Sequence, residues 1–367
     1  MHQLIRRLWG RFSAHLDPFL TWVALALMVV GSMTVYSATY VGNSRLLPEM
    51  VNLFSAFLLM WFVARMPPQT LMRFGIPLYV LGLILLVGVW VAGVKVNGAK
   101  RWLNIGVTRI QPSEIMKIAM PLMLAWYYQC YEASRNWRQH LVAAVLLLVP
   151  VALIAKQPDL GTAILVAAAG FYVIFLAGLP WKVILAMLAA AGAAAPMIWN
   201  VLHDYQRKRI LTLLDPSSDP LGAGYHIIQS TIAIGSGGIF GKGWLNGTQT
   251  HLEFIPEKHT DFIFAVFSEE WGLIGNLVLV MLYLLLIGRA MVIAANAPTL
   301  FTRLLGGSIT LIFFTYAFVN MGMVSGILPV VGVPLPFISY GGTALVTLFL
   351  GLGILMSIQT HRMLVKK

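Results

Sequence analysis

The chain has 367 residues, of which 59% are hydrophobic and only 10% are charged. Because soluble domains carry about 25% charged residues, this composition excludes a globular cytoplasmic protein. The net charge of +12 comes from cations scattered between apolar runs, without the continuous basic stripe that nucleic acid binding needs. The single cysteine excludes an intramolecular disulfide and a catalytic or zinc-binding cysteine cluster.

Ten apolar stretches are candidates for spanning helices, which need about 20 mostly apolar residues to cross roughly 30 Å of hydrocarbon. We therefore predict an all-α polytopic membrane protein with about ten transmembrane helices, forming a single membrane domain over residues 1–367. The stretches lie near residues 19–38, 48–64, 74–93, 113–130, 140–155, 160–178, 182–201, 261–288, 302–327 and 341–360.

Lysine and arginine in short loops favour the cytoplasmic side. Together with loop lengths and acidic residues, this rule places both termini in the cytoplasm and a large loop, residues 202–260, outside the membrane. The loop is far longer than the usual connection of about 4 to 6 residues, and it has apolar residues to bury. We expect a folded cap before the eighth span, with a hairpin turn at Asn246–Gly247.

Several cations lie on the outer side, against the positive-inside rule. They include Arg101 and Arg109 after the third span and Lys242 in the large loop. We expect at least two such cations to contact an anionic ligand. The alternative is pairing with carboxylates of the same loops or with lipid headgroups.

The glycine-rich stretch 235–243 is not a nucleotide-binding loop. A Walker A loop would need glycine where Ser236 stands and a hydroxyl residue at Gly243. Consecutive N–H groups in such a stretch remain a candidate anion nest, which Lys242 would assist.

A dense polar cluster, Glu253 to Asp261, precedes the eighth span. Thr260 is a natural N-cap, and the helix dipole would then stabilise Asp261 in the first turn by roughly 0.3 to 1 kcal/mol. Capping alone would explain this carboxylate. Alternatively, partial desolvation would raise its pKa toward the range of a general base. Glu257, His259 and Asp261 offer donors for a divalent ion, but no second ligand set accompanies them.

Polar residues also mark two other helix starts. Glu114 and Lys117 follow Gln111–Ser113 and share one face of the fourth span through i,i+3 spacing. Ionisable residues at membrane depth tend to mark a site, although a self-neutralising pair that supports a cavity is the alternative. Asp159, two residues after Gln157, stands where a helix cap alone would account for it.

Two features complete the pattern. Glu269 and Glu270 lie inside the eighth span, so at least one should face a partner within the bundle. Prolines 329, 334 and 336 break the chain before the last span, which predicts an uncharged re-entrant turn. Its apolar residues, including Phe337, would suit a lipid tail.

These motifs together resemble the SEDS proteins (shape, elongation, division and sporulation) over nearly the whole chain. The stretch Gly243–Gln249 is similar to RodA, the elongation branch, more than to FtsW, the division branch. The resemblance rests on Gln111–Lys117, Gln157–Thr162, Gly235–Gly243, Pro256–Ala265 and Pro334–Gly342.

The resemblance implies a peptidoglycan glycosyltransferase of the bacterial cytoplasmic (inner) membrane that polymerises lipid II on the periplasmic face. It implies a catalytic role for Asp261 and a supporting role for Glu114 and Lys117. Implied partners are a class B penicillin-binding protein and elongasome proteins such as MreC and MreD. No organic cofactor is implied, and a divalent cation, Mg²⁺ or Mn²⁺, stays open.

We expect Asp261 to accept the proton from the acceptor sugar's 4-hydroxyl as that oxygen attacks the donor's anomeric carbon. Nearby cations, a subset of Arg101, Arg109, Lys117 and Lys242, would stabilise the leaving undecaprenyl diphosphate. The candidate substrate-binding residues are Arg101, Arg109, Gln111, Ser113, Gln157, Asp159, Ser236, Lys242, Glu257 and His259.

Two rival functions remain at this point. A lipid II flippase would also have many spans and intramembrane charge, but a carrier needs comparable access from both sides, whereas the unusual charges here cluster outside. A scaffold that only recruits partners would not require Glu114 and Lys117 at membrane depth.

Overall fold

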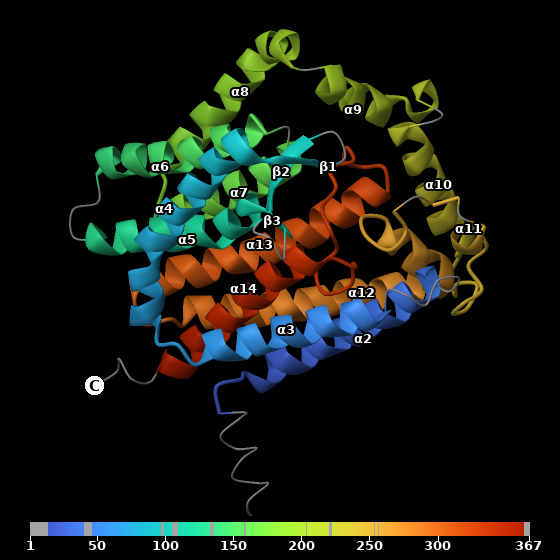
Figure 1. The fold of residues 1–367 in the computed structure, drawn as a ribbon, viewed down its shortest axis with the longest axis horizontal. Coiled ribbons are helices and arrows are strands. Elements are labelled where there is room, and N and C mark those ends of the chain that lie inside the picture. The colour runs from blue at the N-terminus through green and yellow to red at the C-terminus, as the bar shows by residue number, and fades with distance from the viewer. Residues whose placement is uncertain are drawn as a thin grey trace, which may run out of the picture.

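The computed structural model of the chain describes residues 14–39, 46–96, 99–104, 109–132, 136–157, 159–202, 204–219, 222–252, 254–255 and 257–362. These residues form a helical bundle with one small sheet (Figure 1). The helices are α2 (Pro18–Ala38), α3 (Leu46–Ala64), α4 (Pro68–Ala92), α5 (Pro112–Cys130), α6 (Trp137–Ala155), α7 (Leu160–Leu176), α8 (Trp181–Val201), α9 (Asp204–Leu214), α10 (Ala223–Ser236), α11 (Thr248–His251), α12 (Ile263–Ala295), α13 (Leu300–Val324) and α14 (Gly342–Thr360).

Each of the ten predicted apolar stretches is helical, as α2 to α8 and α12 to α14. Among the described residues, six helices are long and apolar enough to cross a membrane: α2, α4, α6, α12, α13 and α14. Three shorter apolar helices lie within α3, α7 and α8. The helical membrane-protein prediction is confirmed, and the count of ten crossings stays a prediction.

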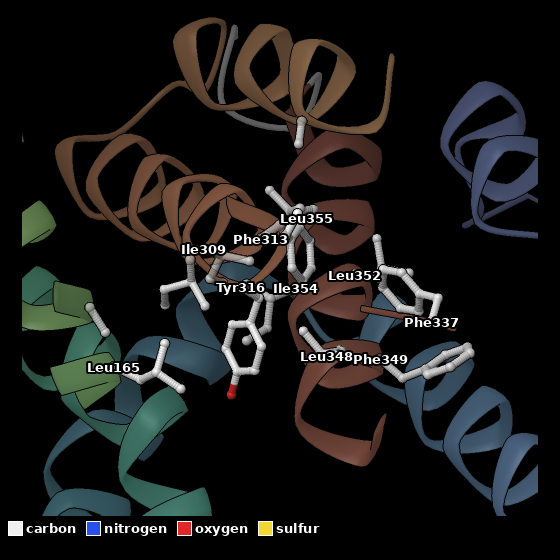
Figure 2. Packing of buried hydrophobic residues seen from close by; sticks show 14 of the residues in the cluster. Leu165, Ile309, Phe313, Tyr316, Phe337, Leu348, Phe349, Leu352, Ile354 and Leu355 are labelled. Atoms are coloured by element: carbon white, nitrogen blue, oxygen red, sulfur yellow. The ribbon is translucent and has the colours of Figure 1, made fainter. Parts of the chain in front are cut away.

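The hydrophobic core runs through the bundle, and part of it lies where α13 and α14 meet the chain that joins them. We name this joining stretch, Pro329–Gly341, the proline-rich segment. Its Phe337 is 3% exposed and meets Phe313 and Phe349 edge-on, at ring distances of 5.8 and 5.5 Å (Figure 2). The expectation that Phe337 lines a lipid-tail site is therefore wrong, because its ring is packed inside the bundle.

A three-stranded antiparallel sheet joins α4 to α5, and the sequence did not predict it. Its strands, in the order β1-β2-β3, are β1 (Val94–Val96), β2 (Ala99–Asn104) and β3 (Arg109–Ile110). Leu103 pairs with Ile110 in the second ladder. The sheet brings Arg101 back toward the start of α5.

The region 202–260 is mostly helical where it is described, with α9, a 3₁₀ turn (Pro216–Ser218), α10 and α11. These elements lie at one edge of the bundle in Figure 1, and α10 packs against α12. The hairpin predicted at Asn246–Gly247 is wrong, because Gly247 instead directly precedes the short helix α11. Glu253 lies outside the described residues.

Helix α12 is broken at Gly272, whose φ of 63° and ψ of −160° are open essentially to glycine alone. The glycine-rich stretch fills the break. Four backbone hydrogen bonds of 2.9 to 3.1 Å join Lys242 N to Glu269 O, Gly243 N to Glu270 O, Leu273 N to Gly238 O, and Ile274 N to Ile239 O. Because an unpaired backbone group in hydrocarbon costs several kcal/mol, these bonds allow a broken helix to persist there.

The same bonds contradict the predicted anion nest. The N–H groups of Lys242 and Gly243 already donate to carbonyls of α12, and Gly241 N donates to Gly237 O at 2.8 Å. The glycines are needed for backbone approach, since a Cβ at Gly272 would overlap Gly241 N and Ile239 O.

Gly272→Ala should therefore lower the apparent unfolding temperature in lipid nanodiscs. Alanine in this backbone region costs of order 1 to 3 kcal/mol, and its methyl group would also push the glycine-rich stretch away. Gly288→Ala is the matched control, because that glycine lies in the same helix with open space beside it. Equal unfolding temperatures for the two variants would contradict a constrained break.

Candidate active site

Three helices begin close together, and two of them, α7 and α12, contact the proline-rich segment at their starts. Gln111, just before α5, donates from Nε2 to Asp159 Oδ2 just before α7, at 2.8 Å. A Cβ on Gly161 would stand 2.7 Å from Val331 O, and a Cβ on Gly332 would stand 3.2 Å from Asp261 Oδ2. The starts of α5, α7 and α12 are thereby gathered around one segment.

Asp261 lies in a turn before α12 rather than in its first helical turn. We name residues 257–262 the catalytic turn, after the role that the sequence analysis expects of Asp261. The carbonyl of Glu257 accepts from both Thr260 N and Phe262 N, at 3.0 and 3.3 Å, so the chain turns twice before the helix begins at Ile263. The Thr260 hydroxyl donates to Glu257 Oε2 at 2.9 Å. The prediction of Thr260 as the N-cap is therefore wrong.

The Asp261 carboxylate is partly exposed and accepts no hydrogen bond from any residue that the structure describes. Burial raises the pKa of this carboxyl, and the negative charge of Glu257 raises it further, to about 6. A carboxylate without a partner and with such a pKa is suited to accept a proton near neutral pH. His259 lies two residues earlier, with its ring edge-on to Tyr340 at 5.9 Å.

Two buried side chains that the sequence analysis missed hold the catalytic turn. Asn320 of α13 donates from Nδ2 to Asp261 O at 2.9 Å and to Val333 O at 2.7 Å. Ser339 donates from Oγ to Thr260 O at 2.7 Å and accepts from Leu335 N at 2.7 Å. In the sequence, Asn320 could have been noticed as a single amide side chain within an apolar helix, because polar residues at membrane depth tend to mark a site.

The Glu114–Lys117 pair forms as the spacing predicts. Lys117 Nζ lies 2.6 Å from Glu114 Oε1 and 2.6 Å from the hydroxyl of Tyr316, and Thr347 donates to Glu114 Oε2 at 3.2 Å. Lys117 is 3% exposed, so its charge is already paired inside the protein. Tyr316 and Asn320 are one turn apart on α13, which connects this pair to the catalytic turn.

Arg101 is a predicted cation whose side chain stays partly exposed. Its guanidinium lies 3.8 Å from Asp159 Oδ1 and is 35% exposed, while its buried Nε has no described partner. Asp159 also caps α7 through Thr162 N at 3.3 Å, as the sequence allowed. The structure does not describe the side chain of Arg109. The backbone of Arg109, in β3, pairs with Asn104 of β2.

Other predicted substrate-binding residues are engaged within the protein. Gln157 donates to Leu86 O at 2.9 Å, and Ser113 is 2% exposed. Ser236 donates to Ala233 O at 2.9 Å at the end of α10. Lys242 binds Glu269 Oε1 at 2.8 Å and Thr248 Oγ1 at 2.7 Å, which leaves it little freedom to meet a substrate.

Both acidic residues of α12 face partners inside the bundle, as predicted. Glu269 is fully buried and accepts from Gln249 N and Thr250 N, at 2.9 and 3.2 Å, as well as from Lys242. Glu270 accepts from the hydroxyl of Ser37 on α2. Within the described part of the chain, no group of three or more His, Cys, Asp or Glu side chains is arranged to hold a metal ion.

Known proteins resemble this chain along nearly its whole length. The family model of the cell cycle proteins FtsW, RodA and SpoVE matches residues 16–364. "Peptidoglycan glycosyltransferase MrdB" of Escherichia coli K12 is 51% identical over 356 residues, which are 97% of this chain and 96% of that protein.

Two solved structures share the fold. A chain of a peptidoglycan synthase complex that coordinates polymerization and crosslinking matches with a TM-score of 0.83 at 35% identity, over 96% of this chain and 99% of its own. The rod shape determining protein RodA of Thermus thermophilus matches with a TM-score of 0.72 at 30% identity, over 95% and 97% of the two chains.

Removing only one member of the Glu114–Lys117 pair should destabilise the protein more than removing both members. Lys117→Met leaves the Glu114 carboxylate with no cation, and loss of one partner of a buried pair costs about 3 to 5 kcal/mol. The double variant Glu114→Gln/Lys117→Met removes both charges and should unfold closer to the wild-type temperature in nanodiscs. Additive losses in the double variant would show that the two side chains act independently.

Proposed function

Because the chain belongs to the FtsW/RodA/SpoVE family of cell cycle proteins, we propose that it is a peptidoglycan glycosyltransferase. It is a multi-pass membrane protein. It joins lipid II into β-1,4-linked glycan strands during cell elongation and so maintains rod shape. The observation that carries this proposal is the Asp261 carboxylate, which has a raised pKa and accepts no hydrogen bond from a described residue, at the place where three helix starts lie together. The names of the relatives support the same activity.

In the proposed reaction, Asp261 takes the proton from the 4-hydroxyl of the acceptor's N-acetylglucosamine. That oxygen attacks the donor's anomeric carbon, and the bond from this carbon to the diphosphate oxygen breaks with its electron pair. One such displacement inverts an α-linked donor into a β-linked product. Electrostatic stabilisation of the departing diphosphate is the main demand on the site.

Arg101 is the described cation best placed for that role, because its guanidinium is partly exposed and its Nε lacks a described partner. Arg109 stays in the proposal as the second cation of the same sheet. Lys117 and Lys242 are bound to Glu114 and Glu269, so we assign them support of the site rather than contact with the leaving group.

A divalent cation would find few protein ligands here. Glu257 and Asp261 are the two carboxylates of the catalytic turn, and His259 lies between them in sequence. Because Mg²⁺ takes six oxygen ligands and usually keeps waters and substrate phosphates among them, an ion at this turn would bind with the substrate's diphosphate. Its chemistry would be neutralisation of the charge on the leaving group.

We propose ten crossings, with both termini in the cytoplasm and residues 202–260 and the active site on the periplasmic side. Helices α5, α7 and α12 are the fourth, sixth and eighth predicted spans. Alternate spans start on the same side of a membrane, and the contacts among Gln111, Asp159 and the proline-rich segment support a common side. With the N-terminus inside, that side is the outer one.

A class B penicillin-binding protein is the proposed partner, because a chain of the peptidoglycan synthase complex shares this fold. The elongasome proteins MreC and MreD are further proposed partners. A lipid II flippase and the division-type FtsW polymerase are less favoured. The polar groups described above gather at one end of the bundle, whereas a flippase needs a path through it.

Asp261→Asn should abolish glycan-chain formation from purified lipid II while the protein still folds and binds its penicillin-binding protein. The amide keeps the shape of the carboxylate but cannot accept the proton. Glu132→Gln is the matched control, since Glu132 is exposed beyond the opposite end of α5. Chains of wild-type length from the Asp261 variant would refute the proposed mechanism.

The rate of polymerisation should fall as the pH drops through about 6, because a protonated Asp261 cannot act as a base. Glu257→Gln removes the charge that raises the pKa of Asp261, so the midpoint of this acidic limb should move to lower pH. The glutamine can still accept the Thr260 hydrogen bond. A midpoint that stays in place or moves to higher pH would contradict this electrostatic link.

A further inference from the structure

The catalytic turn has no internal feature that fixes the Asp261 carboxylate. The turn lies outside α12, and the carboxylate has no hydrogen-bond donor among the described residues. A general base must nevertheless be held in one place, because a misplacement of about 1 Å can cost 100-fold in rate. The position of Asp261 must therefore be set by contacts made elsewhere on the turn.

Two side chains bridge the catalytic turn to the proline-rich segment in the same manner. Asn320 Nδ2 joins Asp261 O to Val333 O, and Ser339 Oγ joins Thr260 O to Leu335 N. Both side chains are buried, with residue exposures of 0% and 5%. A third bond runs directly between the two backbones, from Tyr340 N to His259 O at 2.9 Å.

The proline-rich segment is itself held rigidly by the bundle. Tyr283 of α12 donates to Pro336 O at 2.6 Å. A Cβ on Gly31 of α2 would stand 2.6 Å from Phe337 O, so the two backbones are in close contact. Phe337 packs its ring between Phe313 and Phe349. Because the catalytic turn is hydrogen-bonded to this segment, its position is fixed as well.

The carboxylate itself rests against the same segment. Gly332 has a φ of 75°, and a Cβ there would stand 3.2 Å from Asp261 Oδ2. A side chain at this place would both strain the backbone and take the space of the carboxylate. Glycine is thus the residue that lets the base sit close to the segment.

We propose that Asn320 and Ser339 are positioning residues of the polymerase, which hold Asp261 against Gly332 at the place where the acceptor hydroxyl loses its proton. This inference rests on the proposed function and deepens it. Because both side chains are buried and bonded within the protein, their loss should reduce kcat far more than it changes KM for lipid II.

Ser339→Ala is the principal test, because it removes both hydrogen bonds of one bridge and changes only a single hydroxyl group. We expect kcat to fall about 10- to 100-fold while KM, partner binding and unfolding temperature stay close to wild type. Ser325→Ala is the matched control, because its hydroxyl donates to Met321 O within α13 and reaches no part of the catalytic turn.

The pH profile separates positioning from a general loss of structure. A turn released from the segment exposes Asp261 to water, so the acidic limb of the Ser339→Ala profile should move to lower pH. Gly332→Ala provides a second variant that leaves both bridges in place but displaces the carboxylate, and it should also lower kcat. Asn320→Ser shortens the other bridge and should behave like Ser339→Ala.

Wild-type kcat and an unmoved acidic limb in Ser339→Ala would overturn the inference. If Ser339→Ala loses folding and partner binding together with activity, an unmoved limb in Asn320→Ser or a wild-type kcat in Gly332→Ala would overturn the inference. If the wild-type protein forms no glycan, or Asp261→Asn forms it normally, the proposed function itself fails, and the inference fails with it. If the wild-type protein forms glycan and Asp261→Asn does not, the proposed function stands, and the Ser339 and Asn320 variants then test the positioning inference alone.

Discussion

Every backbone N–H and C=O group within a membrane must find its partner inside the protein, because hydrocarbon offers none. This constraint explains why the chain leaves the helical state at only a few internal places and why those places are filled by other parts of the chain. The break at Gly272 is closed by residues 238–243. In the proline-rich segment, the side chains of Asn320, Ser339 and Tyr283 form hydrogen bonds with backbone groups.

The charges follow a related rule. Lys117, Asp159 and Glu269 are buried, and each is matched by a counter-ion, a hydrogen-bond donor or a helix terminus. Compensated charges of this kind are suited to structural support rather than to reaction. Asp261 has no such compensation among the described residues, and burial together with Glu257 raises its pKa. This difference in compensation supports the proposal that Asp261, and not Lys117, Asp159 or Glu269, takes part in the chemistry.

The sequence predicted the parts of the structure that depend on local pattern. Apolar length gave the helices, and i,i+3 spacing gave the Glu114–Lys117 pair. It missed features that depend on contacts between distant residues. The glycine-rich stretch was interpreted as a ligand nest because its partner, the break in α12, lies 30 residues later in the chain. The cap expected at Thr260 is absent because the Thr260 hydroxyl donates to the Glu257 side chain. Strands β1 and β3, with three and two residues, are too short to show an alternating pattern.

Titration of the Asp261 side chain tests the central claim most directly. Carbon-13 NMR of the protein labelled at aspartate carboxyl carbons, with Asp261→Asn to assign the signal, measures this group without any substrate. The account predicts a midpoint near pH 6, from burial and the charge of Glu257. A midpoint near the ordinary aspartate value of about 3.9 would contradict it, because the carboxylate would then be neither desolvated nor poised as the base.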